Sequence, residues 1–321
     1  MAPIKSSLAR TVGKLLGVQK DTDLSLRGHV QSIREQPFSA SGGSAELTPG
    51  DGYKYHFFTT NDDFTCSAPV SIDYIVIGGG GAGCGQPDGN NYGGGGAGAG
   101  GVRTGTLTVN AGDNPVVVGA TKAAPPDSYD GAVGNPSVAF GITSQGGGSG
   151  GGFDQATAEY NGGSGGGAPH YPNGNGQIGY GNRVTGTTNP APSQGNNGGA
   201  GGNNASGGGG GAGGVGGDSS SPATGGKGGL GIAFPGWTIP TDYGTPGPNG
   251  SLRYFAGGGG GGGNNNGGAA PDAGGGGAGA SSADAGHGTA NTGGGGGSCG
   301  GNNDLDGGDG GSGIVICRYS V

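Results

Sequence analysis

A glycine pattern that could hold a nucleotide follows a short apolar run early in the chain. Ile72–Ile77 is typical of a strand, and Gly78, Gly80 and Gly83 after it fit the spacing GxGxxG. In dinucleotide sites this turn opens a helix whose first N–H groups bind the pyrophosphate. The next eight residues, Cys-Gly-Gln-Pro-Asp-Gly-Asn-Asn, cannot form that helix, and residues 89–112 hold no acid for the ribose. We therefore expect no nucleotide site, and no cofactor of any other kind.

Other groups that could act in catalysis are scattered. The histidines have no HExxH partner, and they are His29, His56, His170 and His287. Lys227 lacks the glycine and the Ser/Thr that a phosphate-binding loop places around its lysine. Acids among glycines could bind a hard cation, but the calcium-loop pattern is met only once and imperfectly, by Asp304, Asp306 and Asp309. A carboxylate pair for glycan hydrolysis would need Asp154 with Glu159, or Asp242. The sequence predicts neither an enzyme nor a metal site.

Aromatic side chains between glycine runs suggest binding rather than catalysis. Tyr and Trp give large, rigid contact areas for each side chain that is ordered. The candidate receptor contacts are Phe153, Tyr160, His170, Tyr171, Tyr180, Phe234, Trp237 and Tyr243. The same rings could instead pack loops onto the rest of the chain, and for most of them the two interpretations are equally supported. We favour recognition for the loop 232–243, which carries the single Trp of the chain.

A glycine-rich backbone must hold these residues in position. The chain has 94 glycines, and they dominate residues 78–313. Ordering a residue costs about 1–2 kcal/mol, most for glycine, which also buries no apolar side chain. Order therefore needs backbone hydrogen bonds, each contributing about 0.5–1.5 kcal/mol. Turn-forming residues break the runs, so we expect packed polyglycine II-type helices rather than disorder.

Charge and cysteines narrow the classes of partner. Residues 1–35 carry a net charge of +3, which leaves −11 for the rest of a chain whose total is −8. An acidic body argues against nucleic acid as a ligand.

No apolar run approaches the roughly 18 residues of a membrane span, so we expect no membrane insertion. Cys66, Cys84, Cys299 and Cys317 form no CxxC pair, which favours buried free thiols over a zinc site.

Three regions follow from these patterns. Residues 1–36 hold an apolar stripe at helical spacing, which predicts a short helical segment that docks onto a larger assembly through Leu8, Val12, Leu15 and Leu16. Residues 37–145 show alternating strand patterns and form an antiparallel framework that a strand at 313–319 completes. Residues 146–312 form the glycine region with its display loops. The predicted fold class is mainly β and irregular, with a small antiparallel β framework clamping polyglycine II-type helices.

Five motifs resemble one known family. They are Asp73-Tyr-Ile-Val-Ile-Gly-Gly-Gly-Gly-Ala-Gly83, Val102-Arg-Thr-Gly-Thr-Leu-Thr-Val109, Tyr254-Phe-Ala-Gly-Gly-Gly-Gly260, Gly288-Thr-Ala-Asn-Thr-Gly-Gly294 and Gly310-Gly-Ser-Gly-Ile-Val-Ile-Cys-Arg-Tyr319. They look like the glycine-rich domain of virion proteins in tailed phages, many of them marine. The architecture is also similar in style to the adhesins at the tips of long tail fibres.

The resemblance implies a structural virion protein made in the host cytoplasm. In the favoured interpretation it is a tail fibre or adhesin at the tail periphery. Residues 1–36 would dock on other virion proteins of the tail or capsid, and the loops would contact a host glycan or outer-membrane protein. A homotrimer is one assembly open to it. The alternative is a capsid decoration or head-fibre protein of the same build.

Overall fold

The computed structural model describes residues 37–86, 93–126, 128–152, 157–170, 178–181, 194–220, 223–248, 250, 252–301 and 304–321. Residues Ala40–Val321 form one compact unit. The predicted docking segment, with Leu8, Val12, Leu15 and Leu16, lies outside the described residues. In the described part of the chain, no helix has the length and apolar character that a membrane span needs.

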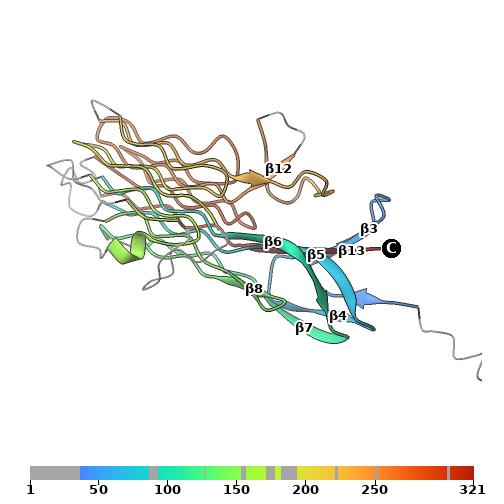
Figure 1. Ribbon diagram of the computed structural model, residues 1–321. Coiled ribbons are helices and arrows are strands. Elements are labelled where there is room, and N and C mark those ends of the chain that lie inside the picture. Colours follow the sequence, from blue (N-terminus) through green and yellow to red (C-terminus); the bar gives the residue numbers. More distant parts are fainter. Residues whose placement is uncertain are drawn as a thin grey trace, which may run out of the picture. The chain divides into compact units, whose positions relative to one another are not determined.

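The regular elements are three antiparallel sheets, each named here by its central strand (Figure 1). The β7 sheet has the order β1 (Ala40–Ser41), β4 (Asp62–Cys66), β7 (Gly112–Val117), β8 (Ser137–Ala139) and β9 (Ile142–Ser144). The β13 sheet has the order β2 (Ala45–Leu47), β3 (Tyr53–Phe58), β13 (Ile314–Ser320), β5 (Val70–Ile77) and β6 (Val102–Val109). The β12 sheet has the order β10 (Ile232–Ala233), β12 (Arg253–Phe255) and β11 (Thr245–Pro246).

The β13 sheet is the middle layer, with the β7 sheet packed on one of its faces and the β12 sheet on the other. Both faces are apolar. Strand residues alternate between the two faces, so neighbouring residues of β5 belong to two different apolar cores. Val76 packs toward the β7 sheet with Phe64. Ile75 packs toward the β12 sheet with Phe255 and Phe234. The closing strand β13 pairs with β3 on one side and β5 on the other, which fixes the end of the chain in the centre of this layer.

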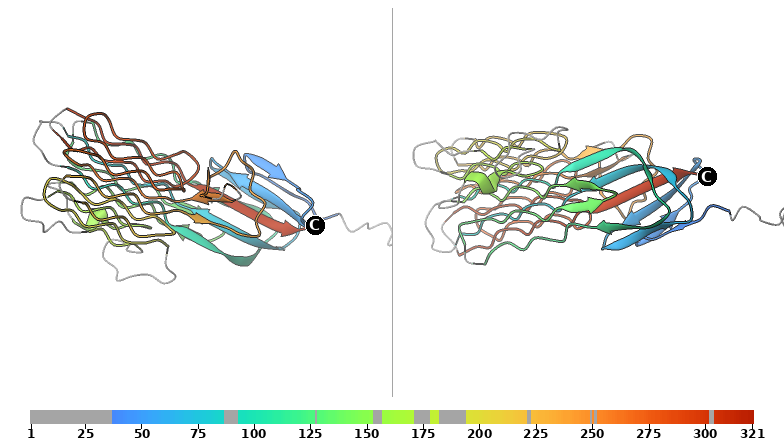
Figure 2. Two further views of the ribbon diagram at one scale, coloured as in Figure 1. Left: turned by 90° about the horizontal axis from the view of Figure 1, so that it is seen from above. Right: turned by 60° about the horizontal axis from the view of Figure 1, so that its bottom comes forward.

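Beyond the sheets, extended glycine segments run side by side in all three views (Figure 1 and Figure 2). Their backbone hydrogen bonds repeat every third residue. The N–H groups of Gly80 and Gly83 donate to the carbonyls of Gly311 and Gly308, both at 2.9 Å. The residue after Gly80 donates to a second neighbouring segment and the residue after that to a third. Each segment is thus bonded in three directions, and its backbone groups are satisfied without a side-chain core.

This spacing explains why the residues are glycine. A Cβ added at Gly96 would collide with the carbonyl oxygen of Gly259 and lie 2.7 Å from its carbonyl carbon. At Gly258 a Cβ would collide with the carbonyl oxygen of Gly209 in the same way. The segments lie close enough for backbone to contact backbone, so a side chain is excluded at such positions.

The predicted fold class is wrong. The described residues form three antiparallel sheets and no α-helix, and the one helical element among them is a 3-10 turn, η2 (Thr157–Tyr160). Polyglycine II-type helices are not among these regular elements, and the predicted N-terminal helix falls outside the described residues. The physical reason is that regular ladders form where β-branched and aromatic residues alternate. The glycine segments bond sideways to one another as extended chain.

Candidate functional site

The loop that follows β10 carries Trp237 and is held at both of its ends. The N–H of Trp237 donates to the carbonyl of Phe234 at 3.2 Å, across a turn in which Gly236 has a φ of 82°. That φ is left-handed and favours glycine. At the other end the guanidinium of Arg253 donates to the carbonyls of Tyr243 (2.7 Å) and Gly244 (2.5 Å). The loop is therefore fixed by backbone contacts and its side chains have defined neighbours.

Arg318 of β13 is the central contact of Trp237. Its guanidinium carbon lies 4.2 Å from the centre of the Trp237 ring and 4.1 Å from that of Tyr53. Its Nε donates to Asp73 at 3.1 Å, and one Nη donates to the carbonyl of Gly236 at 2.6 Å. A cation between two ring faces and beside a carboxylate is a favourable arrangement. The charge holds the loop against the β13 sheet.

A second contact joins the loop to the start of β3. The hydroxyls of Tyr55 and Thr238 both donate to one carboxylate oxygen of Asp51, each at 2.7 Å. These two bonds, the first from Tyr55, keep the pKa of Asp51 below its usual range. Tyr243 stacks on Phe57 with ring centres 4.6 Å apart. Burial, followed by the charge of Asp242, raises the pKa of the Tyr243 hydroxyl. The loop thus packs against the apolar core that contains Ile75, Phe234 and Phe255, named here the second core.

The matching family model covers residues 59–320 and describes a glycine-rich domain. The chain belongs to this glycine-rich domain family. No curated protein matched the chain. The sequence resemblance is therefore confirmed at the level of the glycine-rich domain.

The remaining aromatic candidates of this glycine-rich domain differ in exposure. Tyr160 is buried and donates its hydroxyl to the carbonyl of Gly152 at 2.7 Å. His170 is buried, and its Nδ1 accepts the N–H of Asn204 at 2.6 Å. Phe234 is buried in the second core, whereas Trp237 and Tyr243 are half-buried. Tyr180 is 45% exposed and is the most accessible described candidate. Phe153 and Tyr171 lie outside the described residues.

The groups considered for catalysis are not brought together by the described structure. Glu159 is exposed on η2, Asp242 is exposed on the Trp237 loop, and Asp154 lies outside the described residues. Within the described ranges, no group of three or more His, Cys, Asp or Glu side chains is placed to bind a metal. The N–H groups of Gly78 and Gly80 already donate to the carbonyls of Gly101 and Gly311. These two N–H groups of the GxGxxG turn are therefore already hydrogen-bonded to other segments of the chain.

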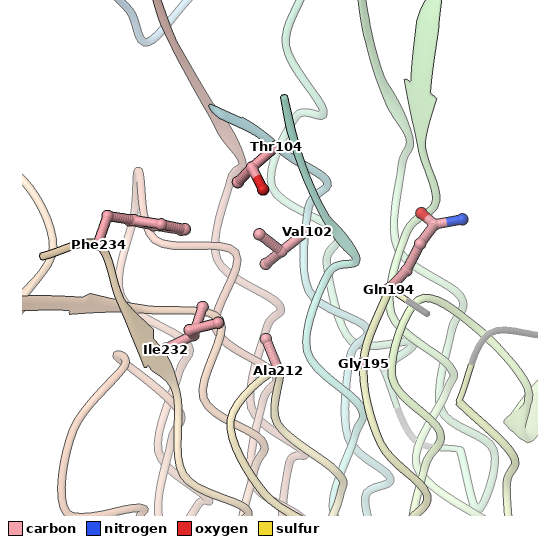
Figure 3. Close-up of a pocket in the computed structure, with 7 residues that line it drawn as sticks. All are labelled: Val102, Thr104, Gln194, Gly195, Ala212, Ile232 and Phe234. Atoms are coloured by element: carbon pink, nitrogen blue, oxygen red, sulfur yellow. The ribbon is translucent and has the colours of Figure 1, made fainter. Parts of the chain in front are cut away.

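The structure also has a pocket that the sequence patterns did not predict. It has a volume of about 220 Å³ and lies where β6 meets β10 (Figure 3). Its lining residues are Val102, Thr104, Gln194, Gly195, Ala212, Ile232 and Phe234. Figure 3 shows the side chains of Val102, Ile232 and Phe234 converging, while the amide of Gln194 points away. Arg318 was also missed, although a charged residue inside the apolar closing strand was a usable signal.

Proposed function

We propose that this glycine-rich domain protein is a non-enzymatic structural component of a tailed-phage virion, a tail fibre or adhesin. The observation that carries the proposal is the bundle of extended segments bonded in three directions by backbone alone. Such a bundle draws its order from the segments, so the connections between segments are free to vary in sequence. A rigid support with variable loops is what a receptor-binding protein needs.

The exposed aromatic of the bundle supports the same function. Tyr180 presents 45% of its surface, and its N–H is fixed by a 2.8 Å bond to the side chain of Asn161. A tyrosine on a rigid backbone loses little entropy when it binds. We propose that Tyr180 contacts a glycan or outer-membrane protein of the host. Trp237 stays a proposed contact through its half-exposed ring, although it also joins the loop to the β13 sheet.

The proposed attachment to the particle rests on charge and chain position. Residues 1–36 carry the basic head, and the body carries a net charge of −11. We propose that residues 1–36 dock on other virion proteins after synthesis in the host cytoplasm, as monomer or homotrimer, and that the acidic body does not bind nucleic acid.

Gold-labelled antibody against the full chain, imaged on purified virions of the encoding phage, tests the assignment. Label at the tail periphery supports the proposal. Label over the head would contradict it and favour the capsid decoration or head-fibre alternative. Absence of label from disrupted as well as intact virions would exclude a virion protein.

An adsorption assay tests the binding role. Host cells preincubated with the purified chain should adsorb fewer phage. The variant Tyr180→Ala should block less well, while the matched control Val215→Ala, at a position 66% exposed, should block like the unaltered chain. Equal blocking by both variants would contradict the role of Tyr180.

A further inference from the structure

The described sheets end in six edge strands, and one of them differs from the rest. The edges β1, β2, β9, β10 and β11 are 2 or 3 residues long. Short edges protect a sheet from pairing with other chains. The sixth edge, β6, is 8 residues long. The fold protects its other edges by their shortness and leaves β6 as a long template.

Strand β6 also lacks most of the other usual protections, and Arg103 is its one charged residue. Its sequence, Val-Arg-Thr-Gly-Thr-Leu-Thr-Val, contains no Pro, Lys or acid and is rich in β-branched residues. It pairs with β5 residue for residue, from Val102 opposite Ile77 to Val109 opposite Val70, without a bulge. Its weak point, Gly105, lies beside the ring of Tyr74, whose hydroxyl would be 2.7 Å from an added Cβ. The edge is therefore continuous and regular.

The free donors and acceptors of this edge can be assigned from one bond. The N–H of Val102 donates away from β5, to the carbonyl of Gln194 at 2.9 Å. In an antiparallel pair, alternate residues point their N–H and C=O the same way. The outward residues are then Thr104, Thr106 and Thr108, and all three are exposed. Among the residues that the structure describes, none forms a backbone hydrogen bond with these groups on this side.

The pocket lies at the first of these threonines. Thr104 lines it together with Ile232 and Phe234 of the neighbouring loop and Ala212 below (Figure 3). Cross-strand neighbours place their side chains on the same face of a sheet. A residue of an added strand opposite Thr104 would therefore direct its side chain toward this pocket, whose lining is part polar and part apolar. The side-chain amide of Gln194 is turned to Gln145, whose N–H it accepts at 2.9 Å, so the apolar part of the lining is formed by Val102, Ala212, Ile232 and Phe234.

We infer that β6 binds an extended peptide segment of a different protein, which adds a strand to the β13 sheet and places one apolar side chain in the pocket. A second copy fits less well. The chain carries a net charge of −8, which opposes self-association. Two β6 strands paired antiparallel about Thr106 would also set Thr108 against Thr104, leaving the pocket without an apolar side chain. The inference does not depend on the proposed virion function.

Selection of a random peptide library on the immobilised full chain tests this. Enriched peptides should be rich in β-branched residues and should carry one Leu, Ile or Phe at a fixed position, for the side chain that enters the pocket. Binding should weaken about tenfold in Thr106→Pro, which removes an outward donor and blocks the edge. The control Thr106→Val, which loses the 2.7 Å bond from Thr106 to Asp73 but keeps the edge, should bind like the unaltered chain. Thermal unfolding verifies that each variant is folded.

Two further readouts make the test independent of the proline variant. Ala212→Leu partly fills the pocket and should shift the selected side chain toward Val or Ala. Bound peptide should slow amide hydrogen exchange at Thr104, Thr106 and Thr108. The inference is overturned if no such peptide is enriched, or if enriched peptides bind Thr106→Pro unchanged. Dimerisation of the free chain that Thr106→Pro abolishes would also overturn it, because the occupant would then be a second copy.

Discussion

The guanidinium of Arg318 lies 4.2 Å from the ring centre of Trp237 and joins the closing strand to a loop from the middle of the chain. The same guanidinium contacts the ring of Tyr53 and the carboxylate of Asp73. The last strand and the Trp237 loop are therefore one structural unit. A change at either residue should affect the stability of the other.

Trp237→Ala should lower the free energy of unfolding by about 2 kcal/mol, because it removes a cation–π contact and exposes part of the second core. Trp237→Phe should recover most of this loss, since a ring remains over Arg318. Chemical denaturation measures both variants. If Trp237→Ala unfolds at the same denaturant concentration as the unaltered chain, the loop does not stabilise the β13 sheet.

Glycine is expected to be required at some positions of the bundle and not at others. Gly96→Ala should destabilise the chain by about 3 kcal/mol or more, because its Cβ would collide with the backbone of Gly259. Gly214→Ala is the matched control, with its nearest neighbour 3.5 Å from an added Cβ, and should be neutral or stabilising by about 0.5 kcal/mol. Thermal unfolding distinguishes the two. Equal effects would contradict the close approach of the segments.

Stability should fall in mild acid because of His56. This ring is buried between Phe64 and Tyr319, its Nδ1 lies 2.8 Å from the carbonyl of Gly42, and burial lowers its pKa below 6.5. In mild acid the unfolded chain therefore binds a proton at His56 that the folded chain does not bind. The contribution of His56 to the free energy of unfolding is complete above pH 6.5. It is lost, by up to about 1.4 kcal/mol for each pH unit, as pH falls toward the folded-state pKa.

The check is the slope of unfolding free energy against pH in the unaltered chain and in His56→Phe. Glu46 lies 3.7 Å from His56 Nδ1 and its pKa depends in part on His56, so the difference reports the histidine together with its interaction with Glu46. A steeper slope in the unaltered chain below pH 6.5 is expected. Identical slopes would show that His56 titrates normally.

The four cysteines should be unreactive in the folded chain. Cys66, Cys84, Cys299 and Cys317 are free and buried. Burial raises the pKa of each thiol, to about 12 for Cys299, so little of the reactive thiolate forms. A thiol reagent at mildly alkaline pH should label none before denaturation and all four after it. Rapid labelling of Cys84 without denaturant would mean that the glycine bundle opens.

The strands with strong side-chain signals were predictable. Ile72–Ile77 lies within β5, and Val102–Val109 coincides with β6, because alternating β-branched residues fix both position and face. The β12 sheet was not predicted, since strands as short as Ile232–Ala233 take their order from packing rather than pattern. The polyglycine II-type helices of the predicted fold class are not among the regular elements of the described residues, because glycine has no side-chain signal to show which neighbours its backbone bonds; the predicted N-terminal helix lies outside those residues.

The candidate site was predictable in composition but not in geometry. The sequence drew attention to Trp237, yet its partner Arg318 is distant along the chain and no local pattern connects them. Burial of Tyr160 and His170 likewise depends on bonds to Gly152 and Asn204 in other segments. The pocket beside Thr104 arises from two sheet edges that meet only in the folded chain.

Native-state amide hydrogen exchange of the full chain tests the central claim, that the glycine segments are held by backbone bonds in three directions. Amides such as those of Gly81, Gly98 and Gly296, which donate to neighbouring segments at 2.9–3.0 Å, should exchange as slowly as those of β5 and β13 and open only with global unfolding. Exchange of these glycine amides at unfolded-chain rates, while the strands stay protected, would contradict the account.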